Sequence, residues 1–218
     1  MSKLFTGTHG QDLLFPIEEL HKTRENVSST FIDNMKLPVH RWFRFSAGFS
    51  AQWVERVITE RASSQETTIL DPFAGSGTTL LAAESIGVKC YGIEAHPFIA
   101  RIARAKLLYR SDQTDYLKHA AIVREHAVRL RVRVDRYPLL IRKCFSDESL
   151  EDLDRLRRAW ERYDDNSPSS ELVWLTLVSV LRAVSHVGTA PWQYVLPNKR
   201  KNGAREPFRA FGLMVQTI

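Results

Sequence analysis

Hydrophobic and polar positions form their clearest pattern in the middle of the first half of the chain. Residues 69–70 end a short apolar run that predicts a buried strand, and a glycine-containing turn follows at residues 72–77. Residues 78–86 then have the composition of a helix, and residues 90–93 form a second apolar run that closes on Glu94. A strand, a tight turn, a helix and a second strand ending in an acid are the first half of a nucleoside-binding α/β fold.

Two further helical patterns flank this unit. Ser50 is placed as the N-cap of a helix that runs to about Arg61, with apolar side chains at helical spacing along one face. We expect that face to be core. Pro97 lies in the first turn of another helix, whose apolar face includes Ile102 and Leu107.

The second half of the chain is mainly helical in its pattern. Ser149 with Asp152 resembles a capping box at the start of one helix. A strongly apolar segment predicts a core helix, and only residues 192–196 have a strand pattern. The helices predicted for this half are residues 112–133, a helix that ends near residue 163, residues 171–187 and residues 206–218.

These patterns predict an α/β fold class, with a partial Rossmann-like sheet and a helical extension. Two parallel strands are clear, and two strands seldom stand alone as a sheet. We expect four regions: an arm at residues 1–37, a nucleoside-binding α/β region at 38–110, a helical region at 111–187, and a basic loop with a C-terminal helix at 188–218.

The composition shows a net positive charge and argues against disulfide-rich, zinc-binding, secreted and membrane proteins. The 218 residues carry a formal net charge of +6, which suits a polyanion such as DNA or a merely basic soluble protein. Cys90 and Cys144 make neither a disulfide framework nor a zinc pattern. The amino terminus lacks a signal-peptide core, and the longest apolar run, residues 172–181, is too short to span a bilayer. We therefore expect a cytoplasmic protein with no metal and no membrane contact.

The turn itself indicates which kind of ligand it suits. Gly75 and Gly77 can adopt positive φ and let a ligand approach the backbone, and the following helix offers free N–H groups to a carboxylate. Glu94 lies about twenty residues beyond the turn, where the acid of a second strand reaches ribose hydroxyls. Leu80 replaces the third glycine of a dinucleotide fingerprint, and no lysine follows Gly77 as in a phosphate-binding loop. The turn therefore favours a nucleoside whose far end is not a phosphate.

The string from Asp71 to Thr79 resembles the S-adenosylmethionine motif of bacterial DNA amino-methyltransferases, which make N4-methylcytosine or N6-methyladenine. An ordinary turn in an unrelated α/β protein is the alternative. The resemblance implies a class I methyltransferase sheet and S-adenosylmethionine as the cofactor. The cofactor contacts that it implies are Asp71, Pro72, Phe73, Ala74, Gly75, Ser76, Gly77, Thr78, Thr79 and Glu94, with Ala95 and His96 beside the adenine.

An aromatic and basic segment, residues 40–50, precedes this motif. By its position it resembles the methyltransferase segment that packs beside the methionine end of the cofactor. Arg44 or Ser46 then meets the cofactor carboxylate, and Phe45 or Phe49 forms a wall of the pocket. The alternative is that the aromatic side chains are ordinary core and the arginines are solvated.

Full amino-methyltransferases carry a second motif, Asp/Asn/Ser-Pro-Pro followed by an aromatic residue, which holds the target base after its extrusion from the duplex. This sequence contains no Pro-Pro pair. We therefore assign no catalytic residue, and we expect the cofactor-binding part of a methyltransferase whose catalytic motif comes from a second chain or a missing segment. By itself the chain is expected to be inactive.

DNA is the expected partner, and the helical region 111–187 is the best candidate for target recognition by elimination. Candidate phosphate contacts are Arg129, Arg133, Lys199, Arg200 and Lys201. Solvated basic side chains are the alternative for each of them. Two other functional hypotheses remain open: a non-catalytic methyltransferase homologue that binds cofactor or DNA, and an RNA methyltransferase.

Overall fold

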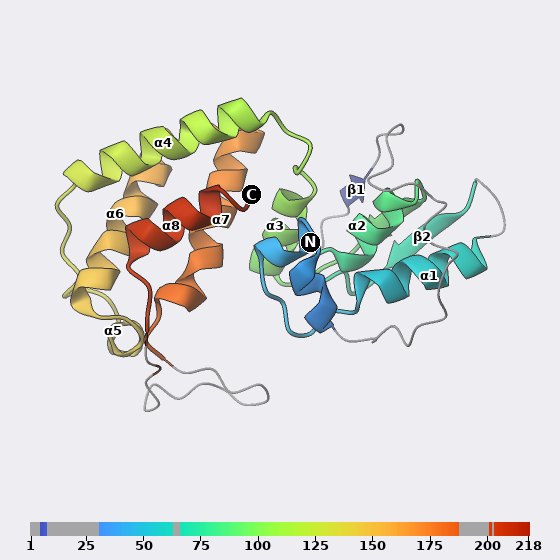
Figure 1. Cartoon of the computed structure of the whole chain (residues 1–218), viewed down its shortest axis with the longest axis horizontal. Helices are drawn as coiled ribbons and strands as arrows, with labels where there is room; N and C mark the ends of the chain where they lie inside the picture. Colours follow the sequence, from blue (N-terminus) through green and yellow to red (C-terminus); the bar gives the residue numbers. More distant parts are fainter. Residues whose placement is uncertain (1–4, 8–30, 63–65, 188–200, 202) are drawn as a thin grey trace. The chain divides into compact units, whose positions relative to one another are not determined.

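The computed structural model describes residues 5–7, 31–62, 66–187, 201 and 203–218. The chain divides into two compact units, Met1–Arg110 and Ser111–Ile218 (Figure 1). The first unit contains the described strands, and the second consists of helices and loops. Each unit is described by itself below.

A small sheet forms the centre of the first unit. Its strands are β1 (Phe5–Gly7), β2 (Thr68–Asp71) and β3 (Lys89–Gly92), in the order β1-β3-β2. β2 and β3 are parallel and are joined through helix α2 (Thr78–Ser85), so the predicted strand–turn–helix–strand unit and the α/β class are confirmed. The register pairs Asp71 with Gly92, which brings the carboxyl ends of both strands to the same edge of the sheet.

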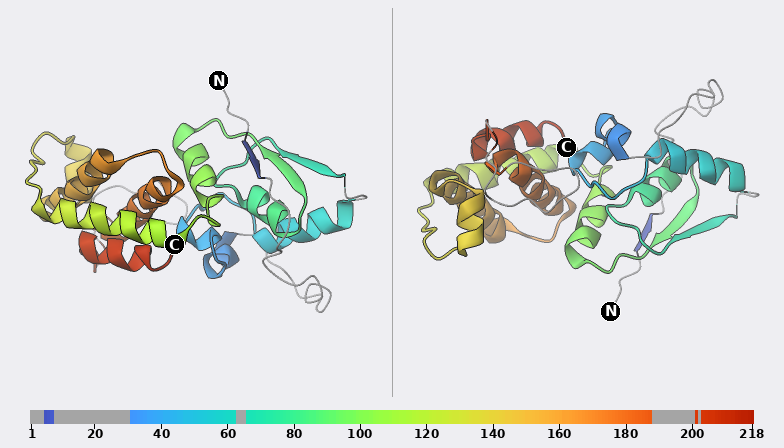
Figure 2. Two further views of the ribbon diagram at one scale, coloured as in Figure 1. Left: turned by 90° about the horizontal axis from the view of Figure 1, so that it is seen from above. Right: turned by 90° about the horizontal axis from the view of Figure 1, so that it is seen from below.

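Two features of this sheet differ from the sequence prediction. β1 lies within the N-terminal arm, for which no strand was predicted, and pairs antiparallel with β3 (Figure 2). Three residues are too few to produce a visible strand pattern. Leu70 was predicted to be buried but is 58% exposed, because side chains alternate between the two faces of β2 and it is Ile69 that points toward the core.

Helices cover the sheet of the first unit. Helix α1 (Ala51–Arg61) packs on α2, and α2 packs on the strands. The Ser50 side chain accepts a hydrogen bond from Trp53 N, as expected of an N-cap. The shared core consists of Val54, Ile58, Ala74, Leu80, Ala82, Ala83 and Cys90. Helix α3 (Pro97–Lys106) follows β3 and begins at the predicted proline.

Two short 3₁₀ helices, η2 (Phe31–Lys36) and η3 (His40–Trp42), precede α1. The buried side chain of Asn34 in η2 donates to the Phe49 carbonyl over 2.7 Å and accepts from Ala51 N over 2.8 Å. These two bonds attach the last residues of the predicted arm to the start of α1. Residues 31–36 are therefore part of the packed unit.

The second unit is a helical bundle of α4 (Gln113–Arg129), α6 (Asp147–Tyr163), α7 (Pro168–Val184) and α8 (Pro207–Val215). α4 crosses α6 and α7, and α8 lies against α7 (Figure 1). α7 is buried along most of its length, as its apolar sequence predicted. Polar bonds join the helices inside the bundle: the hydroxyls of Tyr116 and Thr176 are 2.8 Å apart, and Trp160 Nε1 donates to the Ser170 carbonyl over 3.0 Å.

Several element boundaries in this unit differ from the prediction. α4 ends at Arg129, four residues early, because Leu130 is already extended. α6 is capped by Ser146, whose side chain accepts from Ser149 N, so the predicted capping box at Ser149 is wrong. Helix α5 (Leu139–Cys144) was not predicted, and α7 begins at Pro168 rather than at residue 171. The predicted strand at residues 192–196 lies outside the described residues. Among the described residues, no helix has the length and apolar content needed for a bilayer crossing.

Candidate functional site

The glycine turn between β2 and α2 is fixed to the end of β3. Ile93 N donates to the Asp71 carbonyl over 2.8 Å, and Ala74 N donates to the Ile93 carbonyl over 2.9 Å. The Asp71 carboxylate accepts from Phe73 N over 2.9 Å, which closes a local turn. The path of the turn therefore depends on both parallel strands and not on its own residues alone.

Both glycines of the turn have the backbone conformation that the sequence suggested. Gly75 has φ of 53° and Gly77 has φ of 87°, a region that residues with a side chain seldom adopt. A Cβ atom on Gly75 would lie 2.9 Å from Cε1 of Phe45. The Phe45 ring therefore lies directly over Gly75, and the close approach requires glycine at this position.

Glu94 connects the two loops at this edge of the sheet. Its Oε2 accepts from Gly75 N over 2.9 Å, and its Oε1 accepts from His96 N over 2.8 Å. Sequence reasoning placed Glu94 at the ribose, but it did not anticipate these backbone partners. Each carboxylate oxygen can accept a further bond, so the half-buried carboxylate can hold the loops and a hydroxyl together.

The first turn of α2 provides backbone donors next to Glu94. Gly77 is the N-cap residue and supplies no side-chain cap, which leaves the first N–H groups of the helix available to a ligand. Ser76 and Thr78 are buried, whereas Pro72 and Phe73 are exposed, with Phe73 at 85%. The turn thus has a packed inner side and an open outer side.

The segment at residues 40–50 reaches this turn through two positions. Phe45 lies over Gly75, and a Cβ on Gly48 would be 3.5 Å from Oγ1 of Thr78. Arg44 instead lies 5.7 Å from the ring centre of Phe31, and Phe49 packs on Trp53 at 5.8 Å. Ser46 and Ala95 are exposed. The roles of these side chains toward a cofactor stay predictions.

His96 caps α3 without a side-chain hydrogen bond and is exposed. Its ring meets the ring of Phe98 edge-on at 6.4 Å, and Phe98 meets Phe43 in the same way at 6.3 Å. His96, Phe98 and Phe43 thus form a row of ring contacts that begins two residues after Glu94. An adenine ring is apolar on its faces, so such a surface suits it.

A buried lysine, which the sequence pattern did not single out, connects α3 to the segment at residues 40–50. Lys106 in α3 is 2% exposed, and its Nζ donates to the carbonyls of His40 over 3.2 Å and Phe43 over 3.5 Å. Burial lowers the pKa of Lys106 to about 7. Burial and the neighbouring Lys106 lower the pKa of His40 to about 3. The sequence does contain one sign of this burial: Lys106 lies four residues after Ile102, on the apolar face of α3.

Lys106 is expected to make the stability of the protein depend on pH. The unfolded chain holds this proton up to a pKa near 10.5, whereas the folded chain releases it near pH 7, so the unfolded state binds more protons between these values. The free energy of unfolding is therefore expected to gain a positive contribution as pH rises from 7 to 9. Urea denaturation of Lys106→Met across this range should show a smaller increase than in the unmodified chain.

The exposed Lys118 provides the matched control for this experiment, because Lys118→Met removes the same charge without removing a buried amine. Other groups titrate alike in both variants, and their effects cancel in the comparison. Equal pH slopes for the two variants would show that Lys106 is charged alike in the folded and unfolded states.

The predicted DNA contacts are distributed over the second unit. Arg129 pairs with Glu125, and Arg133 pairs with Asp135 over 3.1 Å, both at the surface. Lys201 Nζ donates to the Arg182 carbonyl over 2.6 Å at the end of α7. Burial lowers the pKa of Lys201. Lys199 and Arg200 lie outside the described residues. In the part of the chain that the structure describes, no three His, Cys, Asp or Glu side chains converge as metal ligands do.

Comparison with known proteins shows which family the site resembles. The sequence profile of the family described as DNA methylase, with N6 and N4 specificity in its name, matches residues 12–105. No solved structure matches the chain. The profile includes the glycine turn, Glu94 and the segment at residues 40–50.

Two curated relatives agree with this match. The chain is 44% identical over 70 residues to the type II methyltransferase M.BsoBI of Geobacillus stearothermophilus, a stretch that is 32% of this chain and 14% of the relative. It is 32% identical over 101 residues to the type II methyltransferase M.AvaI of Nostoc sp., which is 45% of this chain and 21% of the relative. The chain thus matches about a fifth or less of the length of these relatives. Residues 12–105, which include the glycine turn and Glu94, are thus similar to DNA methylases of the amino-methyltransferase type.

Proposed function

We propose that this chain is the cofactor-binding part of a site-specific DNA methyltransferase, which transfers a methyl group from S-adenosylmethionine to an exocyclic amine of cytosine or adenine. The observation that carries the proposal is the Glu94 carboxylate. It joins the glycine turn to the start of α3 at the carboxyl edge of two parallel strands. That arrangement lies within the stretch that matches the DNA methylase family. A Rossmann-like sheet of the class I methyltransferase kind is the fold in which this arrangement would be complete.

The residues at the turn fit such a cofactor. N–H groups at the start of α2 suit the carboxylate of its methionine part, and the positive φ of Gly75 and Gly77 allows the tight turn that presents them. Glu94 has acceptor capacity left for ribose hydroxyls, and the rings near His96 suit the adenine. When bound, the cofactor supplies an electrophilic methyl group. The residues of this chain bind and orient it.

The same residues do not complete an active site. No Pro-Pro motif for the target base is present in the sequence, and we assign no residue of this chain to proton transfer or to the base. We propose that a second chain or a further segment brings this motif to the open side of the turn. The target base would leave the DNA stack to reach it. Positioning of the amine against the methyl group would then supply much of the rate.

The relatives give the proposal its biological class. Both are type II methyltransferases, which suggests site-specific DNA modification in a restriction–modification pair. The net charge of +6 is suited to a DNA partner. Candidate contacts to phosphate remain Arg129, Arg133, Lys199, Arg200 and Lys201.

Calorimetric titration of S-adenosylmethionine into the full chain tests the proposal. We expect saturable binding of one cofactor per chain. ATP has the same nucleoside but a phosphate tail, and the turn has no lysine for it, so ATP is the matched control and should not displace S-adenosylmethionine. A chain that is folded by circular dichroism but binds no S-adenosylmethionine, or from which ATP displaces S-adenosylmethionine, would contradict the proposal.

A further inference from the structure

A cluster of arginines in the second unit surrounds a cavity of about 440 Å³. The cavity is lined by Arg131, Val132, Arg133, Asp135, Arg136 and Arg158, which we call the arginine pocket. Three of the four arginines come from the extended segment between α4 and α5, and Arg158 comes from α6. The family profile ends at residue 105, so nothing in that comparison assigns a role to this pocket.

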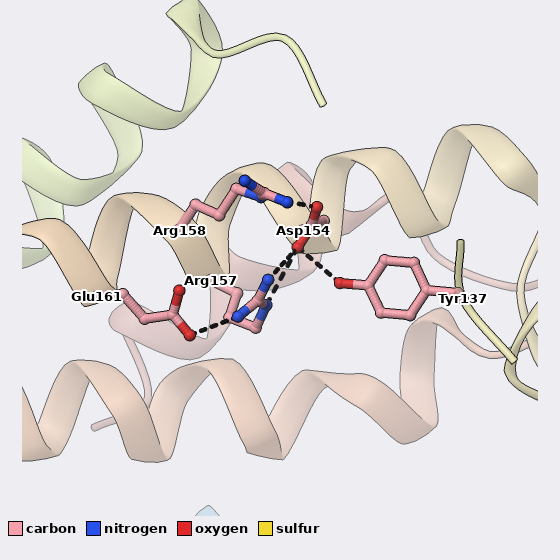
Figure 3. A network of polar contacts seen from close by, with 5 residues as sticks. All are labelled: Tyr137, Asp154, Arg157, Arg158 and Glu161. Atoms are coloured by element: carbon pink, nitrogen blue, oxygen red, sulfur yellow. Dashed lines mark hydrogen bonds and ion pairs between the residues drawn. The ribbon is translucent and has the colours of Figure 1, made fainter. Parts of the chain in front are cut away.

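The pocket is built on a buried polar network (Figure 3). The side chain of Asp154 is fully buried and accepts from the Tyr137 hydroxyl over 2.6 Å, from Arg157 Nε over 3.1 Å and from Arg158 Nε over 2.9 Å. The Tyr137 hydroxyl attaches the segment that carries the other arginines to Asp154 of α6, and Val134 in the same segment is buried. The hydrogen bonds to Asp154 therefore hold Arg158 and the segment of the other arginines in a defined position.

Two of the four arginines in the pocket have no partner among the described residues. Among the described residues, Arg131 and Arg136 make no hydrogen bond and no ion pair, and Arg158 uses only its Nε. Arg133 alone is paired with the one acid of the lining, Asp135. Guanidinium groups gathered in this way repel one another, and an anion between them would remove the repulsion.

The lining also indicates which part of a nucleic acid it suits. It contains no amide side chain to read a base edge and no aromatic ring on which to stack a base. Arginine forks match phosphate oxygens in pairs, and such contacts carry no sequence information. The chemistry of the pocket is therefore that of phosphate recognition.

We infer that the arginine pocket binds a backbone phosphate of duplex DNA, with Arg131, Arg136 and Arg158 as the direct contacts and Asp154 as the residue that positions Arg158. The choice of DNA as the source of the phosphate rests on the proposed function. The pocket gives the helical unit a defined contact that is independent of sequence and separate from the cofactor turn. Arg129, which is paired with Glu125 and does not line the cavity, is not part of it.

The test compares two double variants of the full chain that lose the same charge. Arg131→Gln/Arg136→Gln removes two pocket arginines without a partner, and Arg124→Gln/Arg162→Gln removes two exposed arginines of the same unit that do not line the pocket. Binding of two fluorescent duplexes of unrelated sequence is measured by anisotropy from 50 to 200 mM salt. We expect the pocket variant to bind both duplexes about tenfold or more weakly and to lose about 1 from the salt slope, since one neutralised phosphate contributes about 0.9. The control should bind within about twofold of the unmodified chain.

Several results would overturn this inference. Equal losses of DNA affinity in the two variants would show nonspecific electrostatic attraction by the whole surface. A loss of affinity for one duplex alone would show recognition of bases. Saturable binding of inorganic phosphate that depends on the pocket arginines, without any binding of DNA, would assign the pocket to a small phosphorylated ligand. Cofactor titration of the same variants separates this inference from the proposed function, because S-adenosylmethionine affinity should be unchanged in both.

Discussion

Glu94→Ala is expected to weaken S-adenosylmethionine binding at least about 100-fold. The substitution removes the proposed acceptor for ribose hydroxyls and frees both Gly75 N and His96 N, which weakens the connection between the turn and the start of α3. Each hydrogen bond to a charged group contributes about 1.5 to 3 kcal/mol, and about 1.4 kcal/mol corresponds to a factor of ten in affinity. Isothermal titration calorimetry of the variant measures the loss directly.

Two further variants define what such a loss means. Glu60→Ala removes an exposed acid on the neighbouring helix α1 and should leave cofactor affinity unchanged. Glu94→Gln keeps the size of the side chain but replaces one acceptor by a donor that faces a backbone N–H. Its affinity for S-adenosylmethionine should therefore lie between those of Glu94→Ala and Glu60→Ala. If Glu94→Ala lowered the stability of the chain while the folded fraction bound the cofactor with full affinity, Glu94 would be a structural residue only.

Asp154→Ala is expected to lower the free energy of unfolding by about 2 to 4 kcal/mol. The carboxylate is fully buried and accepts hydrogen bonds from Tyr137, Arg157 and Arg158, which lose their common partner in the variant (Figure 3). The two arginines are partly exposed and regain water, so most of the cost comes from the lost charge-assisted bonds and from the Tyr137 hydroxyl. Urea denaturation followed by circular dichroism measures the change.

The same network supplies a control for this experiment. Glu161 also pairs with Arg157, but its side chain is 47% exposed. Glu161→Gln should therefore change the free energy of unfolding by less than about 0.5 kcal/mol. Similar losses in the Asp154 and Glu161 variants would mean that burial of the Asp154 carboxylate contributes nothing to the stability of the bundle.

The sequence predicted the elements whose signals are local. The strand, turn, helix and strand around Gly75 and Gly77 agree with the structure to within about a residue, because a turn of this shape requires specific residue types in a fixed order. The start of α1 was predicted for the same reason, since Ser50 caps it through its own side chain. The proximity of Phe45 to the turn also agrees with the expected position of its segment.

Features that depend on distant partners were missed. Glu94 was predicted as a ligand, but its bonds to Gly75 N and His96 N arise only when two loops meet in space. The burial of Lys106 depends on the carbonyls of His40 and Phe43, more than sixty residues earlier in the chain. In the sequence Asp154 is one of several acidic residues in a highly charged helix, and only the fold brings Tyr137 into contact with it. Periodicity reports which face of an element is buried, not which polar groups will meet there.

The pairing of β1 with β3 determines the order in which the first sheet can assemble. Phe5 pairs with Gly92, a separation of 87 positions, whereas Thr68 pairs with Lys89 across a loop about a quarter of that length. Closing the longer loop costs about 1.2 kcal/mol more in chain entropy, which favours early formation of the β2–β3 pair. We therefore expect β1 to be the last of the three described strands to join the sheet, after the glycine turn has formed.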